Sequence, residues 1–213
     1  MKHSFYSPAA LLFSMAMGAV VLFSCNNEGN SDKKDDTTAV ATVSAAPDTM
    51  NHAGMHDTAA APMVSHAEAA LSGTYPDTTV SGLVKFDAAA DGKVKMELEI
   101  TVPLKANKSV AVHLHEHGDC GDTGKMAHGH WNPTNAQHGK WGEGSFHLGD
   151  IGNVKLDSKG KGKITLDTNL WTLGGPAASN ILGKAVIVHG GVDDFKTQPT
   201  GNAGTRVGCG VIK

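Results

Sequence analysis

The feature that most constrains the fold is a strict alternation of apolar and charged side chains between Val94 and Ile100. Side chains on a β-strand point alternately to opposite faces of the sheet, so this two-residue period predicts a strand with one face buried in a core. Further runs rich in Val, Ile and Leu, separated by turn signals, cover residues 80–88, 109–117, 153–168 and 183–191. Within the third run, SKGKG predicts a hairpin turn. No convincing amphipathic helix occurs after Ser72, and the pattern therefore predicts an all-β, antiparallel sandwich or barrel.

The first residues of the chain are typical of an export signal. Lys2 and His3 precede an apolar run, AALLFSMAMGAVVLFS, that is too short for a comfortable membrane span. The run ends in LFSC, residues 22–25, which resembles a bacterial lipobox, whose cysteine is acylated and becomes the mature N-terminus. We therefore expect a lipoprotein signal peptide over residues 1–24. A lipid on Cys25 would anchor the protein in a bacterial cell envelope, facing the periplasm or the exterior. An ordinary secretory signal that happens to contain a cysteine is the alternative.

The cysteine count supports this interpretation. Three cysteines are an odd number for an exported protein. If a lipid occupies Cys25, Cys120 and Cys209 remain to pair with each other in an oxidising compartment. Such a bond would close a long loop and stabilise the fold by about 4 kcal/mol. A pair of free thiols is the alternative.

A flexible tether is predicted between the signal and the folded domain, over residues 25–72. Its composition of Ala, Thr, Asp, Asn and Ser cannot bury enough apolar surface to offset the entropy of ordering. Thioether and imidazole groups, which together suit Cu(I) and Cu(II), are interleaved within it at Met50, His52, Met55, His56, Met63 and His66. They predict a copper-binding segment that can act as a copper donor, with compositional drift in a linker as the alternative.

Histidine is unusually frequent in the chain. Twelve histidines stand against 18 Lys and Arg, and the net charge of −3 gives no reason to expect a nucleic acid partner. This histidine content indicates metal or pH chemistry. In AVHLHEHGDC, His113 and His115 project from one face of the predicted strand, while Val112 and Leu114 face the core. A His-x-His pair alone is weak evidence for a metal site, so the assignment depends on motifs further along the chain.

Five such motifs follow in order: HWNP, QHGKWGEG, FHLGDIGN, VIVHGGVDD and GNAGTRVGCG. With them, the chain from about Ser72 to Lys213 resembles the copper/zinc superoxide dismutase family, and we take residues 73–213 as the domain. The resemblance implies a Greek-key β-sandwich or barrel of immunoglobulin-like architecture, with long metal-binding loops. It also implies an enzyme that acts on superoxide and uses copper and zinc as cofactors.

The resemblance further implies which residues bind each metal. The implied copper ligands are His113, His115, His130 and His189, and the implied zinc ligands are His130, His138, His147 and Asp150. His130 would be shared as a bridging imidazolate. Four imidazoles suit a copper ion that changes between Cu(II) and Cu(I), whereas three imidazoles and a carboxylate suit a redox-silent, tetrahedral zinc. Asp193 matches a carboxylate that hydrogen-bonds one ligand of each metal, here His113 and His138.

The implied reaction is disproportionation of superoxide to dioxygen and hydrogen peroxide, by alternate reduction of Cu(II) and oxidation of Cu(I). His130 would serve as the general acid in the second half of the cycle. Arg206 matches a pocket arginine that attracts and orients the anion, with a surface salt bridge as the alternative. The chain departs from the family pattern between Asp194 and Gly201, where FKTQPT is short, and this leaves the rate of superoxide capture open.

Three residues beside these motifs need separate interpretation. His117 continues the alternation, and His128 can compete for the shared position, but we prefer His130 because NP follows Trp131. We expect both extra histidines to be solvated or hydrogen-bonded, and Trp131 to pack in the core. A second class of function is a copper-binding or copper-buffering lipoprotein with the same fold and no turnover. The sequence leaves open whether the domain forms a homodimer.

Overall fold

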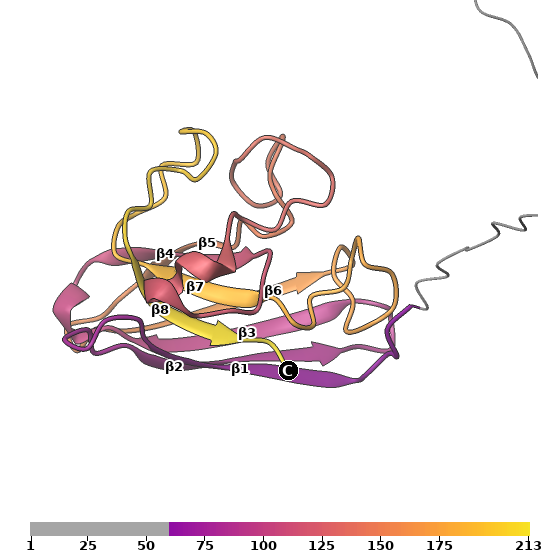
Figure 1. Ribbon diagram of the computed structural model, residues 1–213, viewed down its shortest axis with the longest axis horizontal. Helices are drawn as coiled ribbons and strands as arrows, with labels where there is room; N and C mark the ends of the chain where they lie inside the picture. The colour runs from indigo at the N-terminus through magenta and orange to yellow at the C-terminus, as the bar shows by residue number, and fades with distance from the viewer. Residues whose placement is uncertain (1–59) are drawn as a thin grey trace, which may run out of the picture. The chain divides into compact units, whose positions relative to one another are not determined.

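The computed structural model describes residues 60–213, in which eight antiparallel strands form one sheet that curls into a nearly closed barrel (Figure 1). The strands are β1 His66–Gly73, β2 Ser81–Ala88, β3 Val94–Thr101, β4 Ser109–His115, β5 Gly152–Lys155, β6 Lys161–Thr168, β7 Ala185–His189 and β8 Arg206–Val211. Their order in the sheet is β5-β4-β7-β8-β1-β2-β3-β6, so the chain crosses over in Greek-key fashion between β3 and β4. Two short 3-10 helices, η1 Pro103–Lys105 and η2 Asp122–Ala127, interrupt the connections. The predicted all-β fold is confirmed.

The alternation that predicted a strand lies in β3, which pairs with β2 on one side and with the edge strand β6 on the other. Val94, Met96, Leu98 and Ile100 are buried in the core together with side chains of the neighbouring strands, such as Phe86 on β2. Burying one such side chain contributes roughly 1.5–3 kcal/mol by removing it from water. The barrel interior therefore supplies the rigidity on which the connecting loops depend.

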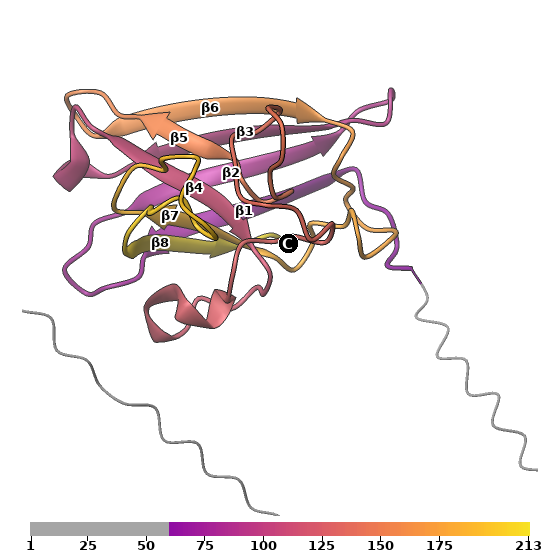
Figure 2. The same cartoon turned by 90° about the horizontal axis from the view of Figure 1, so that it is seen from above.

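The expected hairpin at SKGKG forms its turn but not its ladder. The backbone N–H of Asp157 donates to the carbonyl of Lys161 over 2.8 Å, yet β5 and β6 are the two edges of the sheet and do not pair. β6 instead pairs along its whole length with β3. The two edges lie side by side where the barrel closes (Figure 2), and Gly162 leaves space there for the side chains of Val154 and Leu156. Side-chain packing, rather than hydrogen bonding, closes the barrel at this seam.

The predicted tether boundary at Ser72 is wrong, because His66–Gly73 is strand β1 of the barrel. Its buried face consists of Ala67, Ala69 and Leu71 at alternate positions. Two of these are alanines, which count as linker-like residues in an argument based on composition, so the alternation was overlooked. His66 belongs to this strand and places its Nδ1 2.7 Å from Oδ1 of Asp87 on β2.

The predictions for the N-terminal part of the chain fall mostly outside the described residues. They concern the signal peptide over residues 1–24, the lipid on Cys25 and the copper-binding groups from Met50 to His56. Within residues 60–213, no helix has the length and apolar character needed to cross a membrane.

Two long connections extend from the same side of the barrel (Figure 1). Residues 116–151 join β4 to β5 and contain η2, and residues 190–205 join β7 to β8. A disulfide bond between Cys120 and Cys209 ties the first connection to β8, with the two Cα atoms 5.8 Å apart. The predicted disulfide is confirmed, and it fixes the connection beside the strand that carries Arg206.

Candidate metal centre

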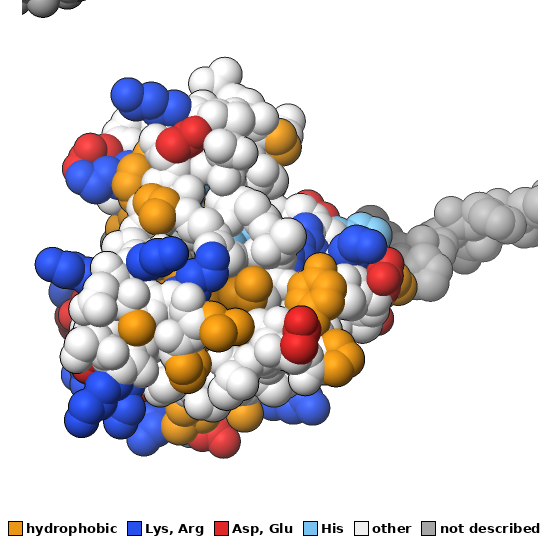
Figure 3. Space-filling model, turned by 90° about the vertical axis from the view of Figure 1, so that its left-hand side faces the viewer, with side chains coloured by type: hydrophobic (Ala, Val, Ile, Leu, Met, Phe, Trp, Pro, Cys, Tyr) orange, Lys and Arg blue, Asp and Glu red, His pale blue; other side chains and the backbone are white. Residues whose placement is uncertain are grey.

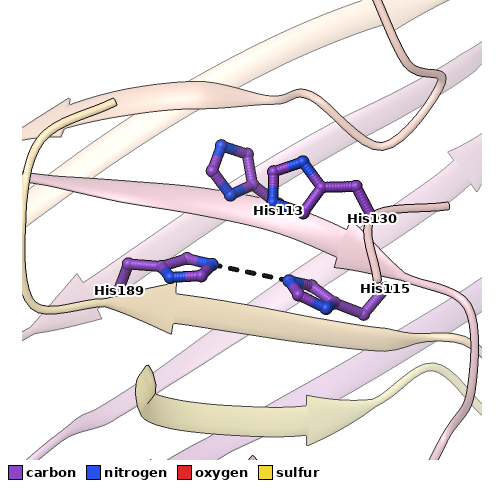
Figure 4. Close-up of side chains that lie close together, drawn as sticks. All are labelled: His113, His115, His130 and His189. Carbon is purple, nitrogen blue, oxygen red and sulfur yellow. Dashed lines mark hydrogen bonds between the residues drawn. The ribbon is translucent and has the colours of Figure 1, made fainter. Parts of the chain in front are cut away.

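Four buried histidines meet at the ends of β4 and β7. His113 and His115 come from β4, His189 ends β7, and His130 lies in the first long connection, where it forms an isolated bridge with His115. One ring nitrogen from each of the four lies within 4.8 Å of the others. Figure 4 shows the rings of His115 and His189 facing each other, with their Nε2 atoms 3.4 Å apart. A single ion can be reached by all four side chains.

Backbone carbonyls set the tautomers of two of these rings. Nδ1 of His115 donates to the carbonyl of His128 over 2.9 Å, and Nδ1 of His189 donates to the carbonyl of Gly204 over 3.2 Å. A carbonyl oxygen can only accept, so in both rings the proton is on Nδ1. The lone pair on Nε2 is therefore available to a metal ion.

The other two rings of the group each have one buried nitrogen with no partner. Nε2 of His113 contacts Oδ2 of Asp193 at 2.8 Å, which leaves Nδ1 of His113 without a hydrogen bond among the described residues. Nε2 of His130 is unpartnered in the same way. Buried polar atoms in folded proteins are nearly always paired, so unpaired nitrogens that converge on one point indicate a ligand at that point.

A second group surrounds the carboxylate of Asp150. Its Oδ1 lies 2.8 Å from Nδ1 of His130 and 3.1 Å from Nδ1 of His147, and its Oδ2 lies 3.0 Å from Nδ1 of His138. The backbone N–H groups of Gly139 and His147 donate to Oδ2 and fix the carboxylate. His130 is the one residue that belongs to both groups. Its Nδ1 contacts the second group, and its Nε2 is the nitrogen left unpartnered.

Burial disfavours the charged form of three rings of the first group, His115, His130 and His189. It lowers the pKa of His130 to about 4 and that of His189 to about 3, and it holds the pKa of His115 well below its usual value. The neighbouring imidazoles add to this effect by mutual repulsion of their charged forms. Neutral rings present lone pairs, which is the state that metal binding requires.

The second group is strongly anionic at its centre. Burial alone would raise the pKa of Asp150, but hydrogen bonds from His130, His138 and His147 lower it far below its usual range. Burial alone would lower the pKa of His138, but its contacts with Asp150 and Asp193 raise it to about 9. The group therefore favours a cation between its carboxylate and its rings.

Asp193 links the two groups. Its Oδ2 contacts Nε2 of His113, and its Oδ1 lies 2.9 Å from Nε2 of His138. The backbone of Asp193 is held in turn by the side-chain amide of Asn153 on β5, in two hydrogen bonds of 2.9 Å. Gly201 has φ +63°, and a Cβ there would overlap Oδ1 of Asp193, so only glycine lets the loop pass this carboxylate. The expected contacts of Asp193 with His113 and His138 are present.

The guanidinium of Arg206 is anchored by the first long connection, in and just after η2. Its Nη1 donates to the carbonyl of Gly124 over 2.6 Å, and its Nη2 donates to the carbonyl of His128 over 2.5 Å. Burial lowers the pKa of Arg206, but the group remains a cation because a guanidinium loses its proton only in strongly alkaline solution. On β8 it stands opposite His189, across a bulge between β7 and β8. The guanidinium is therefore fixed beside the four-histidine group, and the surface salt bridge considered for it does not occur among the described residues.

Side-chain motifs did not reveal two parts of this arrangement. The carbonyl of His128 accepts from both His115 and Arg206, and the amide of Asn153 positions Asp193. The sequence does not show which backbone carbonyl will accept a hydrogen bond, and a single asparagine in a strand belongs to no recognisable motif.

The side chains of His117 and His128 are exposed and join neither buried group, whereas Trp131 is buried in the core as expected.

These observations define an antiparallel β-barrel protein with two adjacent metal-binding groups that share one imidazole. The family model of copper/zinc superoxide dismutase (SODC) matches residues 80–212. The chain is 38% identical over 154 residues to a Cu-Zn superoxide dismutase of Kluyveromyces lactis, covering 69% of this chain and 96% of that one. It is 37% identical over 139 residues to that of Paramecium bursaria Chlorella virus 1, covering 62% and 72%. The crystal structure of the clock protein EA4 is similar with a TM-score of 0.61 and 34% identity, covering 71% of this chain and 95% of that one.

The chain belongs to the copper/zinc superoxide dismutase family. It is an oxidoreductase that acts on superoxide, and its cofactors are copper and zinc.

Proposed function

We propose that the four-histidine group binds copper, that the group around Asp150 binds zinc, and that His130 bridges the two ions. The observation that carries this assignment is the pair of buried nitrogens without partners among the described residues, Nδ1 of His113 and Nε2 of His130. The donor sets fit the two metals. Four imidazoles suit copper in both oxidation states, and three imidazoles with one carboxylate suit tetrahedral zinc. Asp193 holds His113 and His138 so that their Nδ1 atoms face the two ions.

When bound, copper supplies the one-electron oxidation and reduction of superoxide, and zinc supplies fixed positive charge on the far side of His130. The part of His130 is to hold and release a proton at Nε2. Its Nδ1 is engaged with the second group, so Nε2 is the only ring atom that can exchange a proton on the side of the four-histidine group. With zinc held at Nδ1, a proton taken up at Nε2 would make the ring a neutral imidazole, which could then pass this proton on as a general acid.

Arg206 captures and orients the anion. A fixed guanidinium beside a partly buried site attracts a small anion over several ångströms and raises the rate of encounter. The second long connection carries one exposed lysine, Lys196, in its short FKTQPT segment, and the carboxylate of Asp194 accepts from the backbone N–H groups of Lys196 and Thr197. Figure 3 shows lysine and arginine scattered over one face of the domain, with little histidine at the surface. Capture therefore depends mainly on Arg206.

Substituting Arg206 tests this function. We expect Arg206→Ala to lower kcat/KM for superoxide by about 10- to 100-fold at low ionic strength, with the loss shrinking as salt screens the attraction. Arg206→Lys should be faster than Arg206→Ala but slower than the parent protein, because it keeps the charge and loses the two hydrogen bonds that fix the guanidinium. The measurement is the decay of superoxide under pulse radiolysis, with the copper and zinc contents of each protein determined beforehand.

The matched control is Lys196→Ala, which removes an exposed cation from the second long connection and should change the rate little. A metal-loaded protein that binds copper and zinc without turnover would contradict the enzyme and support copper buffering. An active protein that is indifferent to Arg206→Ala would contradict the role of Arg206 alone.

We also propose that Cys25 carries the lipid that holds the protein in a bacterial cell envelope. The support is the LFSC sequence after the apolar run, together with the pairing of the other two cysteines, which leaves Cys25 without a disulfide partner in its own chain. Cys25→Ser should abolish incorporation of labelled fatty acid and move the protein from the membrane fraction to the soluble fraction. Unchanged labelling of that variant would reject the anchor.

We further propose that the segment from Met50 to His56 passes copper to the domain. The support is its chemistry, since thioether and imidazole groups alternate over a few residues. The predicted segment also included Met63 and His66, but His66 belongs to β1, and Met63 stands next to Val64, whose N–H donates to the carbonyl of Leu173. Replacing Met50, His52, Met55 and His56 together with serine should slow copper uptake by the metal-free protein when copper is limiting. Stopped-flow measurement of copper uptake tests this, and equal rates in both proteins would reject the proposal.

A further inference from the structure

A third cluster of metal-binding side chains lies outside the two buried groups. Glu116, His117 and His128 are exposed, and one ligating atom from each lies within 4.8 Å of the others. The rings of His117 and His128 are 4.4 Å apart between centroids, inclined at 65°. Within residues 80–212, which the family model matches, these are the two histidines that belong to neither buried group.

The backbone holds the cluster in a fixed arrangement. The N–H of Glu116 donates to the carbonyl of Gly129 over 3.1 Å, and the N–H of His117 donates to the carbonyl of Ala127 over 3.2 Å. The two ends of the loop over residues 118–126 are thus hydrogen-bonded to each other, next to the bridge between His115 and His130. Preorganised donors lose little conformational entropy when they bind an ion.

His128 is held most firmly of the three. Its φ of 62° is unusual for a residue with a side chain, and its carbonyl accepts from both His115 and Arg206. These contacts fix the peptide and direct the His128 side chain to the outside, toward His117. The disulfide at Cys120 constrains the same loop from its other end.

The three side chains are free to bind a ligand. Among residues 60–213, no hydrogen bond or ion pair engages the rings of His117 and His128 or the carboxylate of Glu116. Two cations lie near the cluster, but both are directed to main-chain carbonyls: Nζ of Lys184 to that of Glu116, at 3.5 Å, and Nη2 of Arg206 to that of His128. Two imidazoles and one carboxylate together offer nitrogen and oxygen ligands for a divalent cation.

We propose that Glu116, His117 and His128 form a third, solvent-facing site for a divalent transition metal ion such as Zn²⁺ or Cu²⁺. Two imidazoles and a carboxylate are a known ligand set for such ions, with the remaining coordination positions open to water. Hard cations such as Mg²⁺ prefer oxygen ligands and would not compete. Binding would join residues 116–117 to residue 128 and close the base of the loop whose carbonyls hold Arg206.

Residue-resolved NMR of the full-length protein tests this site independently of dismutase activity. The protein would be loaded with copper and zinc, reduced with ascorbate to make it diamagnetic, and then titrated with ZnCl₂. We expect the ring resonances of His117 and His128 to shift together and saturate at the same Zn²⁺ concentration. An equal concentration of MgCl₂ should leave them in place. Backbone amides of residues 118–128 should exchange more slowly with deuterium once Zn²⁺ is bound.

Two variants and a matched control make the outcome decisive. His117→Ala should abolish the response of His128 to Zn²⁺, and Glu116→Gln, which preserves side-chain shape, should weaken it. His66→Ala, which removes an exposed histidine beside a carboxylate on β1, should leave both resonances responding as in the parent. The proposal is overturned if His117 and His128 fail to shift, shift at different Zn²⁺ concentrations, or if His128 still responds fully in His117→Ala.

Discussion

Replacing His130 with alanine will deprive both metal-binding groups of a ligand and lower kcat/KM for superoxide by at least about 1,000-fold. The expected loss is this large because three contributions disappear together. The four-histidine group loses one of its nitrogens, the group around Asp150 loses another, and no ring remains to hold a proton between them. Substitution of a residue that serves one group alone, such as His147→Ala, should lower zinc content first and leave most of the copper in place.

Metal content and activity measured on the same samples separate these effects. Each variant would be equilibrated with both ions, dialysed and assayed by plasma mass spectrometry, and then by superoxide decay. His66→Ala is the matched control, since it removes an exposed histidine remote from both groups. If His130→Ala retained both metals at parent levels, the shared role of this ring would be disproved, whatever happened to the activity.

Removing the disulfide with the double substitution Cys120→Ala/Cys209→Ala will destabilise the metal-free protein by about 4 to 5 kcal/mol. The bond joins residues 89 positions apart in the sequence, so its loss frees a large loop in the unfolded chain. Cys209 is also buried in β8, where it packs beside Ala127, Ala185 and Ile187. Urea unfolding of the metal-free protein measures the effect without the additional stabilisation that bound metals give.

The same substitution should reach the site through Arg206. Gly124 and His128, whose carbonyls hold the guanidinium, lie in the loop that begins at Cys120. Loosening this loop should lower kcat/KM even in protein with full metal content. A variant that lost stability and kept the parent rate would show that the two hydrogen bonds alone position Arg206. A loss in stability below about 1 kcal/mol would contradict the loop-closure argument.

Periodicity predicted the strands whose alternation involves large side chains. In β3 the contrast between Met96 or Leu98 and the charged residues between them leaves no other interpretation. β1 was missed because its buried positions are mostly alanine. Alanine can fill a buried position where space is limited, but it does not stand out as a large apolar side chain in the sequence. The SKGKG turn was recognised from its local chemistry, but β6 pairs with β3, and that choice depends on long-range packing that a turn motif does not encode.

The candidate site, too, could be predicted from the sequence only in part. The common face of His113 and His115 follows from strand geometry alone, whereas the sharing of His130 was inferred from a family resemblance and not from spacing. The acceptors of Arg206 were beyond prediction, because they are main-chain carbonyls of Gly124 and His128, positioned by a loop without regular structure. The close approach of Gly201 to Asp193 likewise needs the folded loop to become visible.

The peptide group of His128 has a consequence for redesign of this protein. Its oxygen sets the tautomer of His115 and the position of Arg206 at once, whereas its side chain faces solvent. Position 128 therefore separates two properties that most residues combine: its backbone holds the buried centre, whereas its side chain belongs to the exposed cluster. Its φ of 62° and ψ of −143° lie in a region that glycine adopts without strain, so His128→Gly would keep the backbone frame. The ring can thus be removed from the outer rim of the centre without rebuilding the centre itself.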